Sequence, residues 1–287
     1  MRGWVNAAAN YSEPVAVGQV MRSFAVAEVV RSEHPEYAEG ELLCGMFGWQ
    51  EFAVADGRQV SFKHDPTQAP VTAALGILGV NGLTAYFGLL DVGQPNAGET
   101  VAVSTAAGAV GSAVGQIAKI HGCRTVGITG SDDKAALCRD EFGYAAAINY
   151  RTADLDAALA AACPDGIDVY FDNTAGRISD AVYRRLNLGA RAVVCGTASI
   201  SSWEPWPDGP RIERHLLVKR ARIQGFLLFD YAKRYDEGRA RLAEWLKQGR
   251  LHYREDILDG LEQAPGAIAR LYAGRNTGKL LIRVAPA

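Results

Sequence analysis

The chain has 287 residues, and 48% of them are hydrophobic. A chain of this size can bury about three quarters of its unfolded surface, so we expect one large or two ordinary domains with a packed core. The 30 basic and 32 acidic residues leave a formal net charge of −2, and without a basic run this charge excludes nucleic acid as a first expectation. No stretch comes near the roughly 20 apolar residues that span a bilayer, which predicts no membrane partner and a cytoplasmic location.

Short apolar runs broken by glycine and proline occupy the N-terminal part of the chain. They lie at 15–20, 24–30, 45–55 and 58–62. This spacing predicts a twisted, mainly antiparallel sheet rather than βαβ units. We expect this part of the chain to form a domain of its own.

From about residue 100, short β-branched runs alternate with longer segments of helical period, which is the pattern of βαβ units. The predicted strands are apolar throughout, as expected when helices cover both faces of a sheet; they lie at 100–105, 124–129, 146–149, 167–172, 191–196 and 222–228. The predicted helices lie at 110–120, 132–141, 152–162, 178–187, 236–247 and 260–272, with a last strand at 279–284. Gly122 and Gly189 are placed to end helices, and Thr152 to cap one. The predicted fold class is α/β, with a six-stranded, doubly wound parallel sheet.

The cysteines are far apart and form neither Cys-x-x-Cys nor Cys/His clusters, so we expect reduced thiols and no metal site. They are Cys44, Cys123, Cys138, Cys163 and Cys195. Cys195 lies in a strand-like run and is either a packed small hydrophobe or a reactive thiol.

A turn of small residues follows the first predicted strand of the parallel sheet. Ala106, Gly108 and Gly111 follow the Gly-x-Gly-x-x-Gly spacing, with alanine in the first place. Such a turn lets the backbone approach a dinucleotide pyrophosphate and presents the N–H groups of a helix N-terminus. Small residues at this spacing also occur wherever a helix packs closely on a sheet, so the turn alone leaves both interpretations open.

The end of the second predicted strand bears on the choice of dinucleotide. An NAD-specific turn places a carboxylate there, whereas this chain has Gly130 and Ser131, with Lys134 shortly after. A hydroxyl donor and a cation suit a 2′-phosphate, which favours NADP(H). Asp132 and Asp133 argue mildly against this, although carboxylates also complement the dipole at a helix N-terminus.

These motifs, together with others along the whole chain, resemble the zinc-independent medium-chain dehydrogenase/reductases. The further motifs are residues 79–89, Asn149-Tyr150, Phe171-Asp172-Asn173 and residues 274–279. Within that superfamily the chain is similar to the branch of prostaglandin reductases, 2-alkenal or double-bond reductases and curcumin reductases. The resemblance implies a Rossmann NADP(H)-binding domain (80–254) inserted in a GroES-like catalytic domain (1–79 and 255–287), the cofactor NADPH, and a homodimer. It also implies an N-terminally shortened catalytic domain, because Met1 falls inside a motif of the family.

The resemblance also implies the cofactor contacts. Those at the pyrophosphate are Gly108, Ala109, Val110 and Gly111. Those near the 2′-phosphate are Lys134 and Tyr150, in addition to Ser131. The remaining contacts are Asn173, Cys195, Gly196, Thr197, Ser201, Phe226, Leu227, Leu228 and Asn276. Several of these have structural alternatives: Asn173 bonding a strand end, Tyr150 as a packing residue and Asn276 as a turn former.

The implied reaction is the NADPH-dependent reduction of the carbon–carbon double bond of an α,β-unsaturated ketone or aldehyde, with a hydride delivered to the β-carbon. No histidine lies in a Gly-His-Glu element, so no metal is expected. No residue is assigned as catalytic; Tyr11 is a weak candidate for stabilising charge on the carbonyl oxygen. The alternatives are an NADPH:quinone reductase and, because of the short N-terminus, a catalytically impaired NADPH-binding protein.

Overall fold

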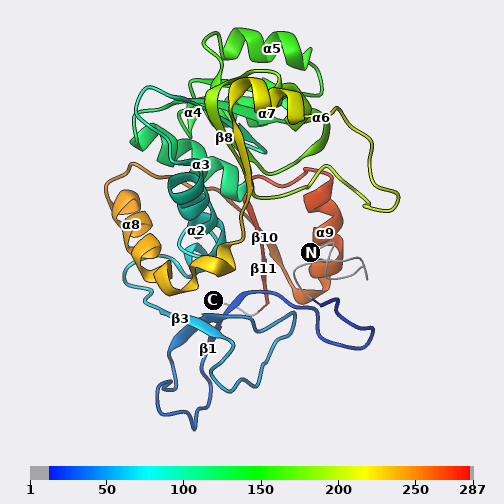
Figure 1. Cartoon of the computed structure of the whole chain (residues 1–287). Helices are drawn as coiled ribbons and strands as arrows, with labels where there is room; N and C mark the ends of the chain where they lie inside the picture. The colour runs from blue at the N-terminus through cyan, green and yellow to red at the C-terminus, as the bar shows by residue number, and fades with distance from the viewer. Residues whose placement is uncertain (1–12, 285–287) are drawn as a thin grey trace. The chain divides into compact units, whose positions relative to one another are not determined.

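The computed structural model describes residues 13–284. The chain divides into two units (Figure 1). The smaller unit takes in Met1–Gly76, Asp256–Ala273 and Leu280–Ala287, and the larger one Ile77–Glu255 and Gly274–Lys279.

A six-stranded parallel sheet is the centre of the larger unit. Its strand order is β6-β5-β4-β7-β8-β9, so the chain runs outward in one direction and then in the other from β4 and β7. The strands are β4 (Thr100–Ser104), β5 (Arg124–Thr129), β6 (Ala146–Asn149), β7 (Ile167–Asp172), β8 (Leu186–Val194) and β9 (Arg222–Gly225). The predicted α/β class with a doubly wound six-stranded sheet is confirmed.

The helices of this unit include the predicted ones, with small shifts at their ends. They are α2 (Val80–Phe87), α3 (Ala109–Ile120), α4 (Asp132–Asp140), α5 (Leu155–Ala162), α6 (Gly176–Tyr183), α7 (Glu213–Lys219) and α8 (Tyr235–Lys247). A π-helical turn, η2 (Gly88–Gly93), and a 3-10 turn, η3 (Leu228–Arg234), complete the unit.

Two predicted strands have other bounds: β8 begins at Leu186 rather than at residue 191, inside the helix predicted at 178–187, and β9 ends at Gly225 rather than at residue 228. Three further local predictions were wrong. Asp154 rather than Thr152 caps α5, because its carboxylate accepts a hydrogen bond from the Ala157 N–H at 3.1 Å. Gly189 lies inside β8 rather than after a helix, where its φ of 75° accompanies an irregular register with β7. Strand β9 is not covered on both faces: it lies at the edge of the sheet and is largely exposed.

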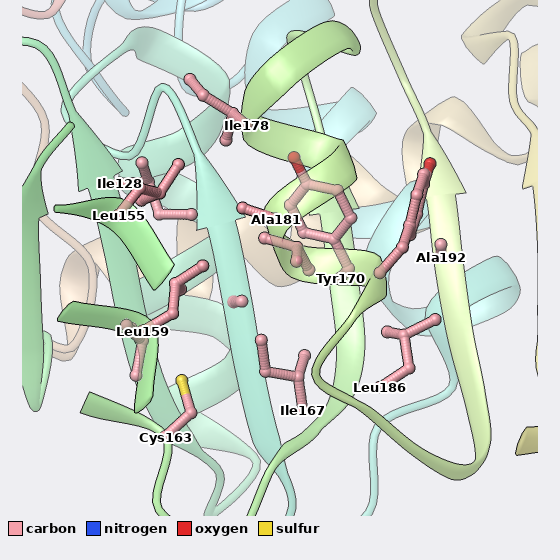
Figure 2. Packing of buried hydrophobic residues seen from close by; sticks show 14 of the residues in the cluster. Ile128, Leu155, Leu159, Cys163, Ile167, Tyr170, Ile178, Ala181, Leu186 and Ala192 are labelled. Atoms are coloured by element: carbon pink, nitrogen blue, oxygen red, sulfur yellow. The ribbon is translucent and has the colours of Figure 1, made fainter. Parts of the chain in front are cut away.

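One face of the sheet packs against α5 and α6 (Figure 2). Leu155 and Leu159 of α5 and Ile178 of α6 lie over Ile128 and Tyr170 of the strands, and all are buried. The spacing of four between the two leucines puts both on one side of their helix. Burying such side chains contributes about 1.5–3 kcal/mol each, which is why these segments fold as helices against the sheet.

The alternate residues of the same strands face the other side. Val169 and Val193 point there, and a Cβ built on Gly93 of η2 would lie 3.2 Å and 3.5 Å from their side chains. A Cβ built on Gly88 would lie 2.9 Å from the Phe171 ring, so this glycine is packed as closely. The π-helical turn η2 therefore covers this face at close range, as expected for a sheet that is covered on both sides.

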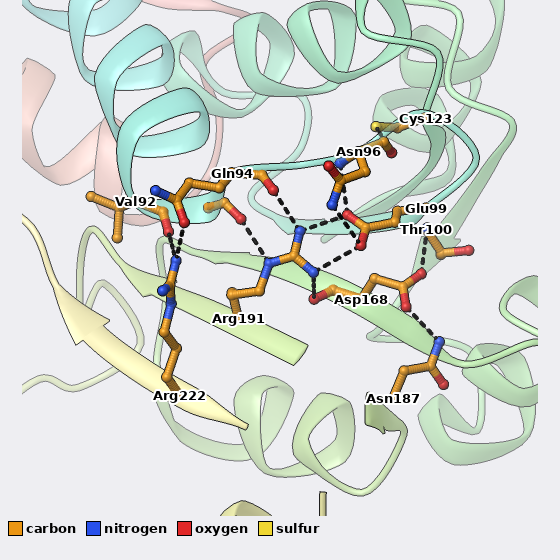
Figure 3. A network of polar contacts seen from close by, with 11 residues as sticks. Val92, Gln94, Asn96, Glu99, Thr100, Cys123, Asp168, Asn187, Arg191 and Arg222 are labelled. Atoms are coloured by element: carbon orange, nitrogen blue, oxygen red, sulfur yellow. Dashed lines mark hydrogen bonds and ion pairs between the residues drawn. The ribbon is translucent and has the colours of Figure 1, made fainter. Parts of the chain in front are cut away.

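A polar network fastens the amino ends of the strands (Figure 3). The Arg191 guanidinium binds both carboxylate oxygens of Glu99, at 2.9 Å and 2.6 Å, and the Gly93 carbonyl at 3.0 Å. In the next strand Asp168 accepts hydrogen bonds from the Thr100 N–H and the Asn187 side chain, both at 2.8 Å. The arginine and glutamate side chains are only 14% and 21% exposed, so this bidentate pair is worth more than a surface ion pair.

Substituting Glu99→Gln is expected to lower the free energy of unfolding by about 2 kcal/mol at neutral pH. Burial by itself raises the pKa of Glu99, but hydrogen bonds from Arg191 and Asn96 outweigh it and leave the pKa below its ordinary 4.5. A lowered folded-state pKa stabilises the protein above pH 4.5, and that contribution is lost as the pH falls through the folded value. Urea titrations of both proteins from neutral to acid pH should show the difference shrinking; a constant difference would contradict the assignment.

The smaller unit contains a three-stranded antiparallel sheet in the order β1-β2-β3. Its strands are β1 (Ala25–Glu28), β2 (Leu42–Gly45) and β3 (Val60–His64). The predicted antiparallel sheet is present, but the runs at 15–20 and 45–55 are turns and irregular segments, and β2 lies earlier than expected. The unit also holds most of the pair β10 (Glu255–Asp259) and β11 (Lys279–Arg283), together with α9 (Ala264–Tyr272). Within residues 13–284 no helix is both long and apolar enough to cross a bilayer.

Candidate dinucleotide-binding site

The strand order reverses between β4 and β7 in the larger unit. In an open parallel sheet, the loops after two such strands diverge and leave a crevice at their carboxyl ends, where ligands bind. The segments that follow β4, β5, β7 and β8 lie at this end of the sheet because all of these strands are parallel. Eleven of the sixteen residues predicted to bind a cofactor lie in these segments.

The small-residue turn after β4 has the geometry of a phosphate cradle. Thr105 has a φ of 53°, unusual for a β-branched residue, and its carbonyl accepts the Gly108 N–H at 2.9 Å. Gly108 is the N-cap of α3, and the first helical residues, Ala109 and Val110, are half-buried. Their N–H groups lie in the first turn, where no intrahelical acceptor exists, so they can bind an anion.

Close packing explains the small residues of this turn. A Cβ on Gly111 would lie 2.3 Å from the Thr105 carbonyl oxygen, so no side chain fits there. Ala106 packs its methyl group toward Gly127 of β5, where an added Cβ would lie 2.8 Å away. The small residues of this turn are therefore consistent with both interpretations. They let α3 pack tightly on the sheet, and they leave no side chain to block a phosphate from the backbone N–H groups.

The segment after β5 supplies a hydroxyl and a cation. Ser131 caps α4 by accepting the Lys134 N–H at 3.3 Å, and Lys134 is half-buried. Burial, and after it the positive charge of Arg151, lower the pKa of Lys134. The Asp132 carboxylate accepts a hydrogen bond from the Asn149 side chain at 2.9 Å, and this contact holds the carboxylate against Asn149.

Arg151 is a residue that the sequence analysis missed. A Cβ on Gly130 would lie 3.4 Å from Arg151 Nε and 3.4 Å from the Tyr150 hydroxyl, so both side chains lie over this glycine. The guanidinium is 6.0 Å from the centre of the Tyr150 ring. Two cations and a phenol thus converge where the second strand ends, an arrangement suited to a dianion. Its position directly after the Asn149-Tyr150 motif was the available signal.

The return segment at 274–279 lies against the same turn. Lys134 Nζ donates to the Gly274 carbonyl at 2.7 Å, and Gly278 pairs with Gly108 in an isolated parallel bridge. Asn276 is buried, and its amide nitrogen donates to the Gly278 carbonyl at 2.8 Å. Asn276 therefore shapes its own turn, as the structural alternative predicted, while lying next to the phosphate cradle.

The loops after β7 and β8 meet at the switch point. Asn173 donates its side-chain amide to the Ser104 carbonyl at 2.7 Å, which ties the ends of β7 and β4 together. The N–H groups of Cys195 and Gly196 both donate to the Asp172 carbonyl, at 2.8 Å and 3.1 Å. Thr197 is half-buried beside them, whereas Ser201 is exposed in the loop beyond.

Burial raises the pKa of the Cys195 thiol to about 12, with the charge of Asp172 as a second cause. Burial likewise raises the pKa of Cys138 to about 12 and those of Cys123 and Cys163 to about 11. Thiolate is therefore scarce at neutral pH, which supports the packed rather than the reactive interpretation of Cys195.

The segment after β9 is divided between core and surface. Phe226 is buried, and its ring lies 3.2 Å from a Cβ built on Gly88. Leu228 is also buried, while Leu227 is partly exposed. Phe226 therefore acts first as a packing residue. Tyr11 lies outside the described residues.

In residues 13–284 there is no group of three or more histidine, cysteine, aspartate and glutamate side chains that could hold a metal ion. The strand order, the bare glycine turn at the switch point and the cations beyond β5 define a dinucleotide-binding α/β protein of the Rossmann type.

Comparison with known proteins identifies the family. A protein-family model described as zinc-binding dehydrogenase matches residues 109–246, and a second family model, described as the N-terminal domain of oxidoreductase, matches residues 1–62. YfmJ of Bacillus subtilis is 50% identical over 287 residues, which cover 99% of this chain and 84% of that protein. The NADPH-dependent curcumin reductase of Escherichia coli is 42% identical over 290 residues, again 99% and 84%.

A solved structure agrees with these matches. CurA from Vibrio vulnificus in complex with NADPH aligns with a TM-score of 0.93 at 41% identity, covering 100% of this chain and 86% of that one. The chain therefore belongs to the medium-chain dehydrogenase/reductases, in the zinc-independent branch of the curcumin, alkenal and prostaglandin reductases. The family resemblance predicted from the motifs is confirmed.

Proposed function

We propose that this chain is an NADPH-dependent oxidoreductase that reduces the carbon–carbon double bond of α,β-unsaturated ketones and aldehydes. Its cofactor is NADPH, and oxidoreductase activity follows from the family. The observation that carries the proposal is the placement of Arg151 and Tyr150 over Gly130, with Lys134 close enough for the charge of Arg151 to lower its pKa. This arrangement suits a 2′-phosphate on a dinucleotide whose pyrophosphate would lie on the 106–111 turn. Relatives named for curcumin, alkenal and pulegone reduction support the substrate class.

The proposed contacts follow the geometry of the site. The N–H groups of residues 108–111 would hold the pyrophosphate, and Ser131, Lys134 and Tyr150 the 2′-phosphate. Asn173, Cys195, Gly196 and Thr197 would lie along the nicotinamide half, with Asn276 behind the cradle. Ser201 and Leu227 remain proposed contacts from exposed positions, and Phe226 and Leu228 contribute by packing.

When bound, NADPH supplies the hydride for the β-carbon of the substrate. The protein's part is orientation and exclusion of water, which needs no ionised nucleophile. Backbone N–H groups at the carboxyl end of the sheet are available donors for charge on the substrate carbonyl. We further propose that residues 1–79 and 255–287 form the GroES-like catalytic domain and that 80–254 form the cofactor domain.

The test is steady-state turnover with enones and enals, following the loss of NADPH absorbance and identifying the product by NMR. We expect the saturated ketone or aldehyde, with the carbonyl intact. An allylic alcohol, or no turnover over a broad panel of enones, would contradict the proposal. Parallel assays with quinones, including a test for semiquinone, separate the quinone reductase alternative; tight NADPH binding without any turnover would favour an impaired binding protein.

We also propose that the protein is a homodimer. Strand β9 is an edge of the sheet, and on the neighbouring α7 Leu217 and Val218 are 78% and 54% exposed. An exposed edge strand beside apolar side chains is a template for pairing with a second copy. Light scattering should give the mass of two chains, and Leu217→Glu, which places a charge on this exposed apolar surface, should shift the mass to one.

A further inference from the structure

We propose that Asp172 is a positioning residue. Its buried carboxylate would hold the turn at residues 173–176 in the conformation against which the nicotinamide half of NADPH binds. The proposal rests on the proposed function, since it assumes NADPH at the switch point. Asp172 is the last residue of β7 and is 1% exposed, so it would act through the backbone around it rather than by touching the cofactor.

The carboxylate gathers hydrogen-bond donors from the turn itself. Its Oδ1 accepts the N–H groups of Thr174 and Ala175, both at 2.9 Å. On the core side, Tyr170 donates its hydroxyl to Oδ1 at 3.1 Å, and Ser179 donates to Oδ2 at 2.6 Å. A buried acceptor with this many donors is rigidly placed, and removing it would leave buried N–H groups unpaired.

The turn needs this support because its backbone is strained. Ala175 has φ 59° and ψ −166°, a combination that is nearly restricted to glycine and costs about 1–3 kcal/mol. The Ser199 hydroxyl donates to the carbonyls of Thr174 and Ala175, at 2.8 Å and 3.0 Å, and secures the turn from the side of the β8 loop. Strain that the surroundings maintain at the end of a switch-point strand indicates a functional conformation.

The position of this turn assigns it to one half of the cofactor. A doubly wound sheet consists of two mononucleotide-binding halves, here β4 to β6 and β7 to β9, and a dinucleotide crosses between them. The adenosine half would lie over the cations beyond β5, so the nicotinamide half would lie at the ends of β7 and β8. Asp172 joins those two ends, since its carbonyl accepts the N–H groups of Cys195 and Gly196.

The experiment compares two ligands by calorimetry: NADPH, and 2′,5′-ADP, which has only the adenosine half. For Asp172→Ala we expect the Kd of NADPH to rise at least about tenfold and kcat to fall by a similar factor, because the turn loses its anchor. The Kd of 2′,5′-ADP should stay within about twofold, because the adenosine half does not depend on this turn. A role limited to global stability would weaken both ligands alike.

Asp168→Ala is the matched control, because Asp168 is a carboxylate on the same strand that accepts two hydrogen bonds at the opposite end. It should lower stability without separating the two ligands. Asp172→Asn should stay within about threefold of the wild type, since an amide oxygen can replace Oδ1. If Asp172→Ala does not fold, Ser199→Ala tests the same turn, because the Ser199 side chain is exposed and its loss should not prevent folding. This variant should raise the Kd of NADPH about threefold and leave the Kd of 2′,5′-ADP unchanged.

Equal weakening of both ligands, or NADPH binding like that of the wild type in both alanine variants at 172 and 199, would overturn the positioning role alone. A wild-type protein that binds no NADPH would overturn the proposed function as well. The two failures are therefore distinguishable.

Discussion

Substituting Gly111→Ala is expected to weaken NADPH binding by at least about a hundredfold and to destabilise the larger unit by several kcal/mol. The added methyl group would lie 2.3 Å from the Thr105 carbonyl oxygen and 2.8 Å from Ala106 Cα. Both are backbone atoms, so α3 would have to move away from β4, and with it the N–H groups proposed to bind the pyrophosphate. Fluorescence titration with NADPH and thermal unfolding measure the two effects.

Gly266→Ala is the matched control for this substitution. Gly266 lies in α9 with nothing within 4 Å of a built Cβ, so alanine there should leave NADPH binding unchanged and raise stability by about 0.5–1 kcal/mol. NADPH affinity in Gly111→Ala within a few-fold of the wild type would show that the cofactor does not depend on this turn.

The second large effect concerns the preference for NADPH over NADH. Removing the charge of Arg151 with Arg151→Gln should lower the ratio of the two kcat/KM values about tenfold, and Lys134→Gln by at least as much, because a hydrogen bond to a charged group is worth about 1.5–3 kcal/mol. The double variant should lose about a hundredfold or more, since both cations would face one phosphate. The expected loss is in kcat/KM for NADPH alone.

The activity with NADH serves as an internal control, because Lys134 also holds the return segment through the Gly274 carbonyl. If that hydrogen bond were the main role of Lys134, its loss would lower both activities together. Arg139→Gln removes a charge from the same helix α4 at an exposed position and should change neither activity. An unchanged cofactor ratio in the double variant would refute the 2′-phosphate assignment.

Local sequence patterns were sufficient to predict the parallel sheet. β4, β5, β6 and β7 match their predicted segments to within a residue, because fully buried strands are apolar throughout and end at polar or glycine residues. The errors occurred where the backbone follows tertiary contacts. Gly189 resembled a helix end but absorbs an irregularity between β7 and β8, and the polar edge strand β9 depends on its neighbour rather than on its own pattern.

The sequence by itself determined the fold class, the glycine turn and, through the motifs, the family, because each depends on residues close together in the chain or in a fixed order along it. Only the tertiary structure brought Arg151 beside Gly130, and only it brought the N–H groups of Cys195 and Gly196 to the Asp172 carbonyl. Those contacts join the ends of neighbouring parallel strands, β5 with β6 and β7 with β8. Their partners are decided when parallel strands align their carboxyl ends, a step that no local pattern encodes.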